Sequence, residues 1–189
     1  MVVLALAICA VALLFTSGAL GANPSANLDQ CANFAANPPG PTSCTNADPT
    51  DWVNGNLGAS KAKYLEGNSI PYRLRMANLS LGSHKVTIEW DTTQGGKHAL
   101  DYLTTFNRTV AAADPCAGVS GCGSPSTFEI PADPNVTGAG VTPVPGKFTL
   151  YNGTINAVSA YTLSAPYSGN SSTRITITFT ASTPSPVLA

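Results

Sequence analysis

The sequence predicts an all-β protein, an antiparallel β-sandwich of about seven strands preceded by an irregular leader. Three observations support this fold class. Apolar and polar residues alternate with a period of two in several short runs, which is typical of strands with one buried face. The 17 glycines and 15 prolines are frequent between these runs, where turns are expected. Behind the N-terminal segment, no run of useful length repeats with the 3.6-residue period of an amphipathic helix.

The composition excludes several classes of protein. Only 10% of the residues are charged and the formal net charge is −1, so the chain has no stripe of Lys and Arg such as a nucleic-acid-binding protein needs. A helical bundle is also disfavoured, since its surface would be rich in Glu, Lys and Arg. Because 43% of the residues are hydrophobic and the net charge is small, we expect the chain to fold.

The N-terminus has the pattern of a secretory signal peptide. Residues 2–15 are almost wholly apolar, and among the small residues that follow, Ala19 and Gly21 fit the small-x-small cleavage motif. The apolar run is shorter than the about 20 residues of a membrane-spanning helix. We therefore predict that residues 1–21 are removed before Ala22, which implies an extracellular or cell-surface protein with no membrane span in the mature chain. An uncleaved anchor and a buried helix are the alternatives, and no positive charge precedes the apolar run.

The next segment, residues 22–58, is predicted to be an irregular leader that contains a disulfide. Its residues 37–41 and 54–56 are turn formers. Trp52 is its one aromatic residue besides Phe34. We expect Trp52 to anchor the leader to the folded domain.

Residues 59–189 are assigned to the β-sandwich domain. Its expected strands are, in order, 72–77, 84–90, 99–110, 127–130, 148–151, 155–163 and 174–180. The last is the clearest, since Ile175, Ile177 and Phe179 alternate with threonines. A single antiparallel sheet would leave one apolar face bare, so a second sheet is needed to bury that face.

Two connections in this domain have the character of hairpin turns. Residues 78–83 have the length of a hairpin loop between the first two strands, and Asn152-Gly153 is a strong tight-turn signal between the fifth and the sixth. Beyond the last strand, residues 187–189 resemble the opening of a further strand after a proline-rich run. We therefore expect the domain to be truncated at its C-terminus, with a short exposed tail as the alternative.

Four cysteines remain once Cys9 is removed with the signal peptide: Cys31, Cys44, Cys116 and Cys122. An even number in an oxidising compartment predicts disulfides, and three pairings are possible. We favour the pairs nearest in sequence, Cys31–Cys44 and Cys116–Cys122, because each lies in a stretch rich in Pro, Gly and Asn. A zinc site is disfavoured, since the sequence has no C-x₂-C pair and both histidines lie far from the cysteines.

Five N-x-[ST] triplets are possible glycosylation sites if the protein comes from a eukaryote. Their asparagines are Asn78, Asn107, Asn135, Asn152 and Asn170. Such triplets also arise by chance in a chain rich in Asn, Ser and Thr, so they do not identify the source.

No arrangement of residues predicts catalysis. The sequence has no G-x-S-x-G motif. His98 lies near Asp91 and Asp101 in sequence, so a His–Asp contact is possible, and a structural histidine is favoured over a catalytic one. Glu89 and Asp91 lie on the solvent side of their predicted strand and do not suggest paired catalytic carboxylates. We predict no enzyme activity and no cofactor; the metal to consider is calcium, with Asp91 and Asp101 as candidate ligands.

An aromatic platform for carbohydrate is the main alternative to a purely structural role. The candidates are Trp90, Tyr64, Tyr72, Tyr102, Tyr151, Tyr161 and Tyr167. Most lie at inward positions of predicted strands, and aromatic residues make up only 7% of the chain. Each is therefore expected in the core rather than on a binding face.

Three stretches resemble a module of large secreted bacterial surface proteins: residues 52–74, 86–93 and 97–109. In those proteins an N-terminal unit of this kind is followed by prealbumin-like or Ig-like repeats of the adhesin type. The resemblance covers roughly residues 27–189 and implies an Ig-like or prealbumin-like sandwich with a structural or adhesive role. It implies no catalytic residues. This chain lacks the downstream repeats, which favours a fragment.

We therefore expect a non-enzymatic, secreted structural or adhesive domain of a bacterial cell-surface or extracellular matrix protein. The expected partners are other cell-surface or matrix proteins or repeats, and no nucleic acid. A carbohydrate-binding module, with glycans as partners, is the alternative. Less favoured are a secreted hydrolase and a subunit of an extracellular filament, in which a sheet edge accepts a strand from a neighbour.

Overall fold

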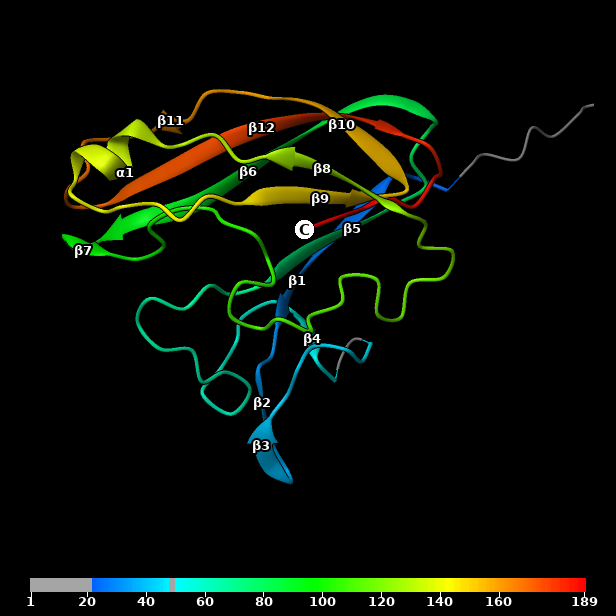
Figure 1. Ribbon diagram of the computed structural model, residues 1–189, viewed down its shortest axis with the longest axis horizontal. Helices are drawn as coiled ribbons and strands as arrows, with labels where there is room; N and C mark the ends of the chain where they lie inside the picture. The colour runs from blue at the N-terminus through cyan, green and yellow to red at the C-terminus, as the bar shows by residue number, and fades with distance from the viewer. Residues whose placement is uncertain (1–21, 48–49) are drawn as a thin grey trace, which may run out of the picture.

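The computed structural model describes residues 22–47 and 50–189. The predicted signal peptide, residues 1–21, therefore lies outside the described residues. The described chain is almost all β, with antiparallel sheets in a sandwich-like arrangement (Figure 1). Seven of its strands have five residues or more, which matches the expected number. The predicted fold class is confirmed.

The larger sheet has six strands in the order β4-β1-β5-β13-β9-β8. Their bounds in that order are Trp52–Asn54, Ser25–Cys31, Tyr72–Ala77, Val187–Leu188, Lys147–Tyr151 and Pro125–Glu129. The smaller sheet has the order β10-β12-β6-β7, and β11 also pairs with β12. Its strands are Gly153–Val158 (β10), Ser171–Ala181 (β12), Gly82–Gln94 (β6), Lys97–His98 (β7) and Thr162–Leu163 (β11).

Three short elements complete the described part of the chain. They are the hairpin of β2 (Phe34–Ala36) and β3 (Pro39–Pro41), and the helix α1 (Pro134–Gly138). Among the described residues, no helix has the length and hydropathy needed to cross a membrane.

The main hydrophobic core lies between the two sheets. β12 supplies Ile175, Ile177 and Phe179, each at most 1% exposed, and Phe148 and Leu150 of β9 join the same cluster from the larger sheet. Burying each such side chain contributes about 1.5–3 kcal/mol. The alternation predicted for β12 is confirmed, since its threonines at 176, 178 and 180 point to the other side of the strand.

Neither of the two predicted hairpins forms. β5 belongs to the larger sheet and β6 to the smaller one, so residues 78–83 carry the chain between sheets. Likewise β9 pairs with β8 and β13, whereas β10 pairs with β12. Asn152, with φ 60°, and Gly153 form the corner between the sheets. A Cβ on Gly153 would lie 2.6 Å from the carbonyl oxygen of Thr180, so close approach of two strands requires this glycine.

Residues 99–110, predicted to be a strand, are irregular. Only the first two residues continue the pairing of β7 with β6. Farther on, Leu103 packs on the main core and Phe106 on a second cluster. The apolar residues of this segment are thus buried as expected, but by a loop that passes between two clusters.

The leader, residues 22–58, is only partly irregular. It contains β1 and β4, which belong to the larger sheet, and β1 pairs with β5 from Ser25 to Gln30. Its other described residues are loop, apart from the β2–β3 hairpin that projects at the bottom of Figure 1. The boundary expected at residue 58 therefore does not separate the leader from the sandwich. The sequence of β1, SANLDQC, lacks the aromatic and β-branched side chains typical of strands.

The expected strand at residues 187–189 is present as β13, between β5 and β9. Val187 and Leu188 are 1% and 3% exposed. Ala189 exchanges two backbone hydrogen bonds with Thr149, at 2.8 and 2.7 Å. The alternative of an exposed tail is therefore wrong.

Candidate functional site

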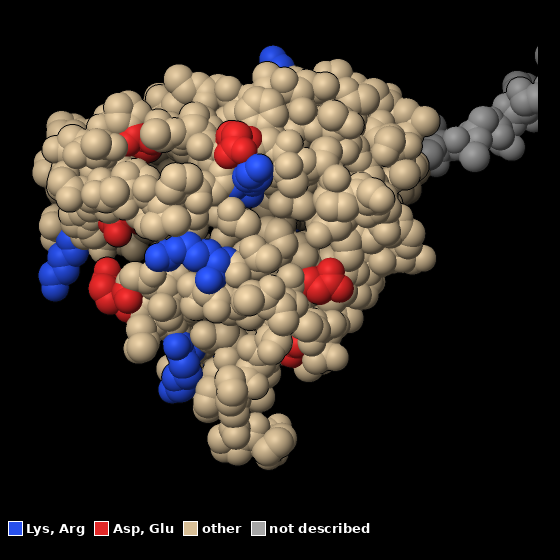
Figure 2. All heavy atoms as spheres, viewed as in Figure 1, with Lys and Arg blue, Asp and Glu red and all other residues tan. Residues whose placement is uncertain are grey.

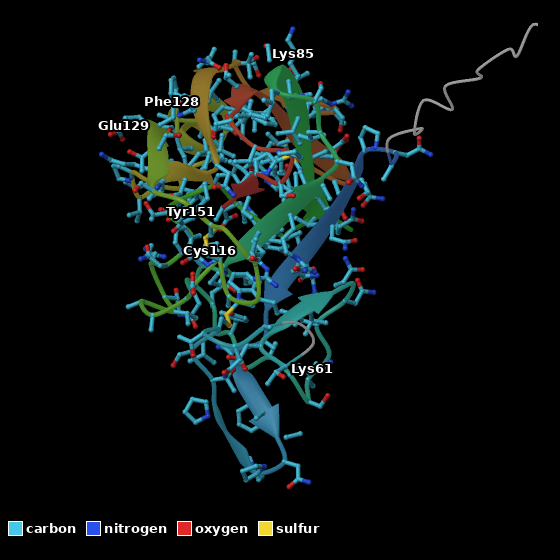
Figure 3. The ribbon with its side chains drawn as sticks, turned by 90° about the vertical axis from the view of Figure 1, so that its right-hand side faces the viewer. Lys61, Lys85, Cys116, Phe128, Glu129 and Tyr151 are labelled. Atoms are coloured by element: carbon cyan, nitrogen blue, oxygen red, sulfur yellow. A yellow bond between two sulfur atoms is a disulfide. The ribbon has the colours of Figure 1, made fainter. Side chains whose placement is uncertain are left out.

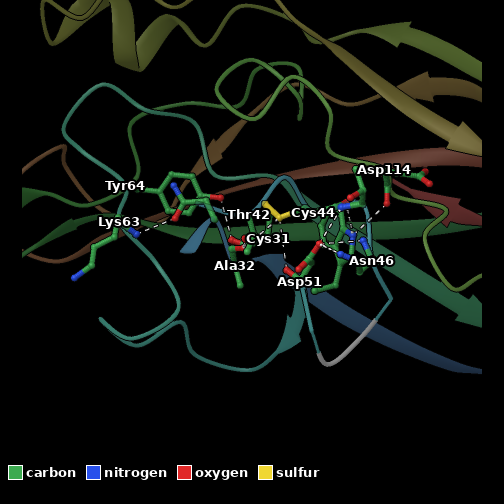
Figure 4. Close-up of a disulfide and its surroundings, with 12 residues drawn as sticks. Cys31, Ala32, Thr42, Cys44, Asn46, Asp51, Lys63, Tyr64 and Asp114 are labelled. Atoms are coloured by element: carbon green, nitrogen blue, oxygen red, sulfur yellow. Dashed lines mark hydrogen bonds between the residues drawn. A yellow bond between two sulfur atoms is a disulfide. The ribbon is translucent and has the colours of Figure 1, made fainter. Parts of the chain in front are cut away.

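A second hydrophobic cluster lies against the side of the larger sheet that faces away from the main core. It contains the disulfide Cys31–Cys44 together with Trp52, Ala113 and Ala117. Both cysteines are fully buried. Figure 4 shows the disulfide among the surrounding loops. The leader and the long loop between β7 and β8 meet here, so the cluster joins segments far apart in sequence.

Trp52 connects these segments. Its indole Nε1 donates to the carbonyl oxygens of Cys44 and Asp114, each at 3.1 Å. The guanidinium of Arg73 lies over the ring, with Cζ 4.6 Å from the ring centre, in the geometry of a cation–π contact. The predicted role of Trp52 as the anchor of the leader is confirmed by these contacts.

A buried ion pair lies beside this ring. Asp29 of β1 and Arg73 of β5 are direct cross-strand partners, and Arg73 Nε donates to Asp29 Oδ2 at 2.9 Å. Both side chains are fully buried. Arg75 Nε donates to the same oxygen at 2.7 Å. Arg73 Nη1 also donates to the carbonyl oxygens of Pro115 and Ala117, at 3.1 and 2.6 Å, so it ties the sheet to the long loop.

The sequence did not predict this cluster. Alternation in β5 places its two arginines on the polar side of the strand, which is normally solvated. In the structure the long loop covers that side. One signal was available: Asp29 is the only charged residue between residues 22 and 47, and an isolated acid in an otherwise uncharged segment that becomes buried needs a basic partner.

The second disulfide, Cys116–Cys122, closes a short loop within the same covering segment. The N–H of Cys116 donates to Asp114 Oδ1 at 2.8 Å. This disulfide therefore constrains the stretch whose carbonyl groups hold Arg73. Both disulfides have the predicted pairing, which leaves none of the four predicted cysteines to bind zinc.

His98 and Asp101 form the His–Asp contact that the sequence allowed. His98 Nδ1 lies 2.6 Å from Asp101 Oδ1, and the ring of Tyr167 packs edge-on against the imidazole. The histidine side chain is 49% exposed. Within the described residues, no hydroxyl or thiol is hydrogen-bonded to its Nε2.

The two candidate calcium ligands, Asp91 and Asp101, have no third acidic side chain grouped with them in the described residues. Asp91 is exposed on β6, whereas Asp101 is bonded to His98. The described part of the chain contains no group of three or more His, Cys, Asp or Glu side chains that could hold a metal ion. Calcium needs six to eight oxygen ligands, usually with several carboxylates among them.

No aromatic side chain in the described ranges forms an exposed platform. Trp90 is 8% exposed, its Nε1 donates to the carbonyl oxygen of Leu100 at 3.1 Å, and its ring packs edge-on against Tyr161. All six tyrosines are half-buried. Trp90 therefore lies in the main core as expected, and Tyr161 packs against it, whereas the other five tyrosines belong to neither hydrophobic cluster.

Burial raises the pKa of several tyrosines, most strongly those of Tyr64 and Tyr161. Their hydroxyl groups donate to backbone carbonyl oxygens, of Cys31 at 2.9 Å and of Pro131 at 2.8 Å. A phenol that is desolvated and donates a hydrogen bond is held in its neutral form. These tyrosines therefore fix loops to the sheets.

The five N-x-[ST] asparagines differ in exposure. Asn78 and Asn170 are exposed, Asn107 and Asn135 are half-buried, and Asn152 is buried. Asn152 donates through Nδ2 to the carbonyl oxygen of Ser185 at 3.1 Å and accepts at Oδ1 from the N–H of Gly123 at 2.9 Å. A glycan on Asn152 would break these contacts, so this predicted site is incompatible with the fold.

The outer face of the smaller sheet carries hydroxyl, amide and charged side chains. Thr87 of β6 and Thr176 of β12 are neighbours across the strands, and their hydroxyl oxygens lie 2.9 Å apart. Thr180 donates to Asn156 of β10, also at 2.9 Å. The sequence predicted threonines on this face; their pairing across strands depends on the sheet order and was not predictable.

On the face shown in Figure 2, the charged groups are few and spread among uncharged residues, and they do not gather in a hollow. A hollow of about 400 Å³ lies between Phe106 and the β8–β9 edge of the larger sheet. Its charged residues, Glu129 and Lys147, form an exposed ion pair of 2.9 Å. An exposed pair of this kind is typical of a solvated surface rather than of an active site.

Comparison with protein-family models, curated proteins and solved structures gives no match. The resemblance to a module of bacterial surface proteins therefore stays a prediction. What the fold and the two clusters define is an all-β sandwich with two disulfides, one face covered by loops and the other polar.

Proposed function

We propose that this chain is a secreted, non-enzymatic β-sandwich domain of a bacterial cell-surface or extracellular matrix protein, with a structural or adhesive role. The observation that carries the proposal is the pair of disulfides. Structural disulfides are rare in a reducing cytosol and common in exported proteins. Cys31–Cys44 is part of the second cluster and is fully buried, as a structural disulfide is.

The surfaces of the two sheets support a structural rather than a catalytic role. Loops cover one side of the larger sheet, and short polar side chains cover the outer face of the smaller one. The exposed His98–Asp101 pair is held by Tyr167 and has the environment of a structural contact. A serine-reactive activity probe should therefore leave the protein unlabelled, and labelling would favour the hydrolase alternative.

Export is tested by expressing the whole chain, residues 1–189, with a C-terminal tag in a bacterium. We expect the tagged protein outside the cytoplasm, beginning at Ala22, with Cys31–Cys44 and Cys116–Cys122 formed in non-reducing peptide maps. Protein retained in the cytoplasm with free thiols would refute the extracellular role.

Adhesion is tested with beads that carry the purified domain. Beads are applied to bacterial cells, to extracellular matrix and to bare surfaces. Retention that exceeds that of beads bearing the reduced and alkylated domain supports adhesion. Equal retention leaves a purely structural role as the proposal.

A carbohydrate-binding role is the second candidate, favoured by the hydroxyl and amide groups on the outer face of the smaller sheet. Because Trp90 is buried, sugar would bind through hydrogen bonds rather than by stacking. A glycan array should then give hits that Thr178→Val abolishes. Hits unaffected by this variant would place binding elsewhere.

A further inference from the structure

β6 is the longest described strand, and most of one edge has no strand beside it. On one side β12 pairs with β6 from Gly82 to Thr93. On the other side β7 pairs only with Thr93 and Gln94, and two further backbone bonds reach Thr92 and Asp91. Among the described residues, no strand or backbone hydrogen bond occupies this side between Ser83 and Trp90. Such an edge is a template for another strand.

The open edge leaves two apolar side chains of β6 less buried than their neighbours on β12. Val86 and Ile88 point toward the core but are only half-buried. Their partners on β12, Ile177 and Ile175, are at most 1% exposed. The difference arises because β12 has strands on both sides, whereas β6 lacks a neighbour here. Apolar surface therefore remains to be buried at this edge.

We propose that two copies of this chain associate through the β6 edge, antiparallel and about a two-fold axis at Thr87. In this register Lys85 of each copy lies directly opposite Glu89 of the other. Both residues are exposed on the outer face. The two-fold axis therefore produces two ion pairs between the copies, each across the paired strands. The partner is a second copy because the sequence of the edge is complementary to itself.

The same register pairs the apolar residues. Val86 of each copy lies opposite Ile88 of the other, on the side of the strand that faces the core. Opposite β-branched side chains stabilise a strand pair. Thr87 lies opposite its own copy, and a pair of threonines is also favourable in this position. The proposed register therefore places favourable side-chain pairs on both faces of the joined sheet.

Charge also selects this register against others. A pairing centred on Lys85 would place two lysines opposite each other, and one centred on Glu89 would oppose two carboxylates; like charges directly opposite are unfavourable. Lys85 has no ion pair or side-chain hydrogen bond within the described part of the chain. Glu89 is bonded through Oε1 to Ser172, at 2.6 Å, and lies 3.6 Å from Arg174 through the same oxygen. Its Oε2 remains available.

The other long edge of the sandwich is less suited to a partner. β8 is short and begins with Pro125, which has no N–H to donate. Ser126 Oγ donates to the carbonyl oxygen of Gly153 at 3.0 Å and accepts from the N–H of Ile155 at 3.4 Å. β10 thus lies against part of β8. The β6 edge has neither feature.

The first test is sedimentation of the mature domain over a range of concentrations up to about 1 mM, where even a weak dimer is populated. We expect reversible dimerisation. Lys85→Glu places carboxylates opposite one another twice and should weaken the dimer at least about tenfold. Lys61→Glu, at an exposed lysine far from the edge in Figure 3, is the matched control and should have no effect.

The double variant Lys85→Glu with Glu89→Lys separates this register from a general effect of charge. It restores opposite charges at both positions, so the dimer should return to within about threefold of the unaltered domain. Failure to recover would overturn the Thr87-centred register.

A cysteine at the axis gives an independent readout. With both native disulfides formed, Thr87→Cys adds a single thiol that meets its copy across the axis. Mild oxidation should yield a covalent dimer. Thr178→Cys, on the same outer face but one strand away, should yield much less. Circular dichroism checks that each variant is folded.

A monomer at the highest concentration would overturn the proposal. So would a dimer whose dissociation constant is unchanged by Lys85→Glu, or equal cross-linking at positions 87 and 178. These results would leave the proposed extracellular role intact, because the self-association rests on the edge of β6 and not on that role.

Discussion

Arg73 links three parts of the molecule through one side chain. It bonds to Asp29 on the neighbouring strand, to the carbonyl groups of the long loop and to the face of Trp52. Buried ion pairs of this kind add little over a well-packed apolar group, but removing one partner leaves an uncompensated buried charge. Arg73 also ties the long loop to the sheet, since its Nη1 donates to the carbonyl oxygens of Pro115 and Ala117.

Asp29→Asn tests the cost of that charge. Arg73 and Arg75 lose their shared carboxylate, so the free energy of unfolding should fall by about 3–5 kcal/mol in urea titrations. Glu129→Gln removes one partner of an exposed pair and should cost at most about 1 kcal/mol. Equal losses for the two variants would contradict the role assigned to the buried pair.

The buried tyrosines predict a loss of stability at high pH. Burial raises the pKa of Tyr64 and Tyr161 in the folded state above the unfolded value of about 10. Their contribution is therefore complete below about pH 10 and is lost as the pH rises toward the folded pKa. Denaturant titrations should give a constant free energy of unfolding up to about pH 9 and a decrease above about pH 10.

The matched variant for this pH dependence is the double substitution Tyr64→Phe and Tyr161→Phe. Phenylalanine cannot ionise, so the alkaline decrease should become shallower, although the stability at neutral pH drops with the lost hydrogen bonds. An unchanged slope above pH 10 would show that other groups cause the alkaline loss.

Among the elements, the corner between β9 and β10 depends on a single glycine. Gly153→Ala would bring a Cβ to 2.6 Å from the carbonyl oxygen of Thr180, so the strands must move apart. We expect a loss of about 1–3 kcal/mol in thermal or urea unfolding. Gly58→Ala is the control, since nothing lies within 4 Å of its added Cβ, and it should change stability by less than about 0.5 kcal/mol.

The strands themselves were largely predictable, and their assignment to sheets was not. Alternation located β5, β6 and β12 because each has one apolar face. It could not show that residues 78–83 and Asn152-Gly153 join different sheets, since a tight corner and a hairpin turn use the same residues. β1 was missed because its sequence has little strand propensity and is held in place by β5 and by the Asp29 ion pair.

The disulfide pairing was predictable because the two cysteines of each pair are close in sequence. Each pair closes a short loop, and short separations favour local pairing when the intervening residues are turn formers. The position of the disulfides beside Trp52 and Arg73 was not predictable, because it depends on the long loop folding back over the sheet. The polar outer face of the smaller sheet followed from the threonines of β12.

At the scale of the whole molecule, the two disulfides should differ in importance. The chain-entropy model gives about 3 kcal/mol for the loop closed by Cys31–Cys44 and about 2 kcal/mol for that closed by Cys116–Cys122. Cys31–Cys44 is also fully buried in a core, so its loss leaves unfilled space.

Paired alanine variants test this difference. Cys31→Ala with Cys44→Ala should reduce the free energy of unfolding by more than Cys116→Ala with Cys122→Ala, measured by urea titration under oxidising conditions. The second pair of substitutions should chiefly increase hydrogen exchange in the loop around Ala117. A larger loss for the second pair would contradict the central role of the first disulfide.

β13 also affects the order in which the strands of the larger sheet come together. Within the described residues, β5 and β9 are joined in the sheet through β13, so this gap closes only once residues 187–188 are in place. Contacts this distant in sequence slow folding. The pairs β1–β5 and β8–β9 do not need β13, so the larger sheet can form as two halves that are joined only when residues 187–188 insert between them.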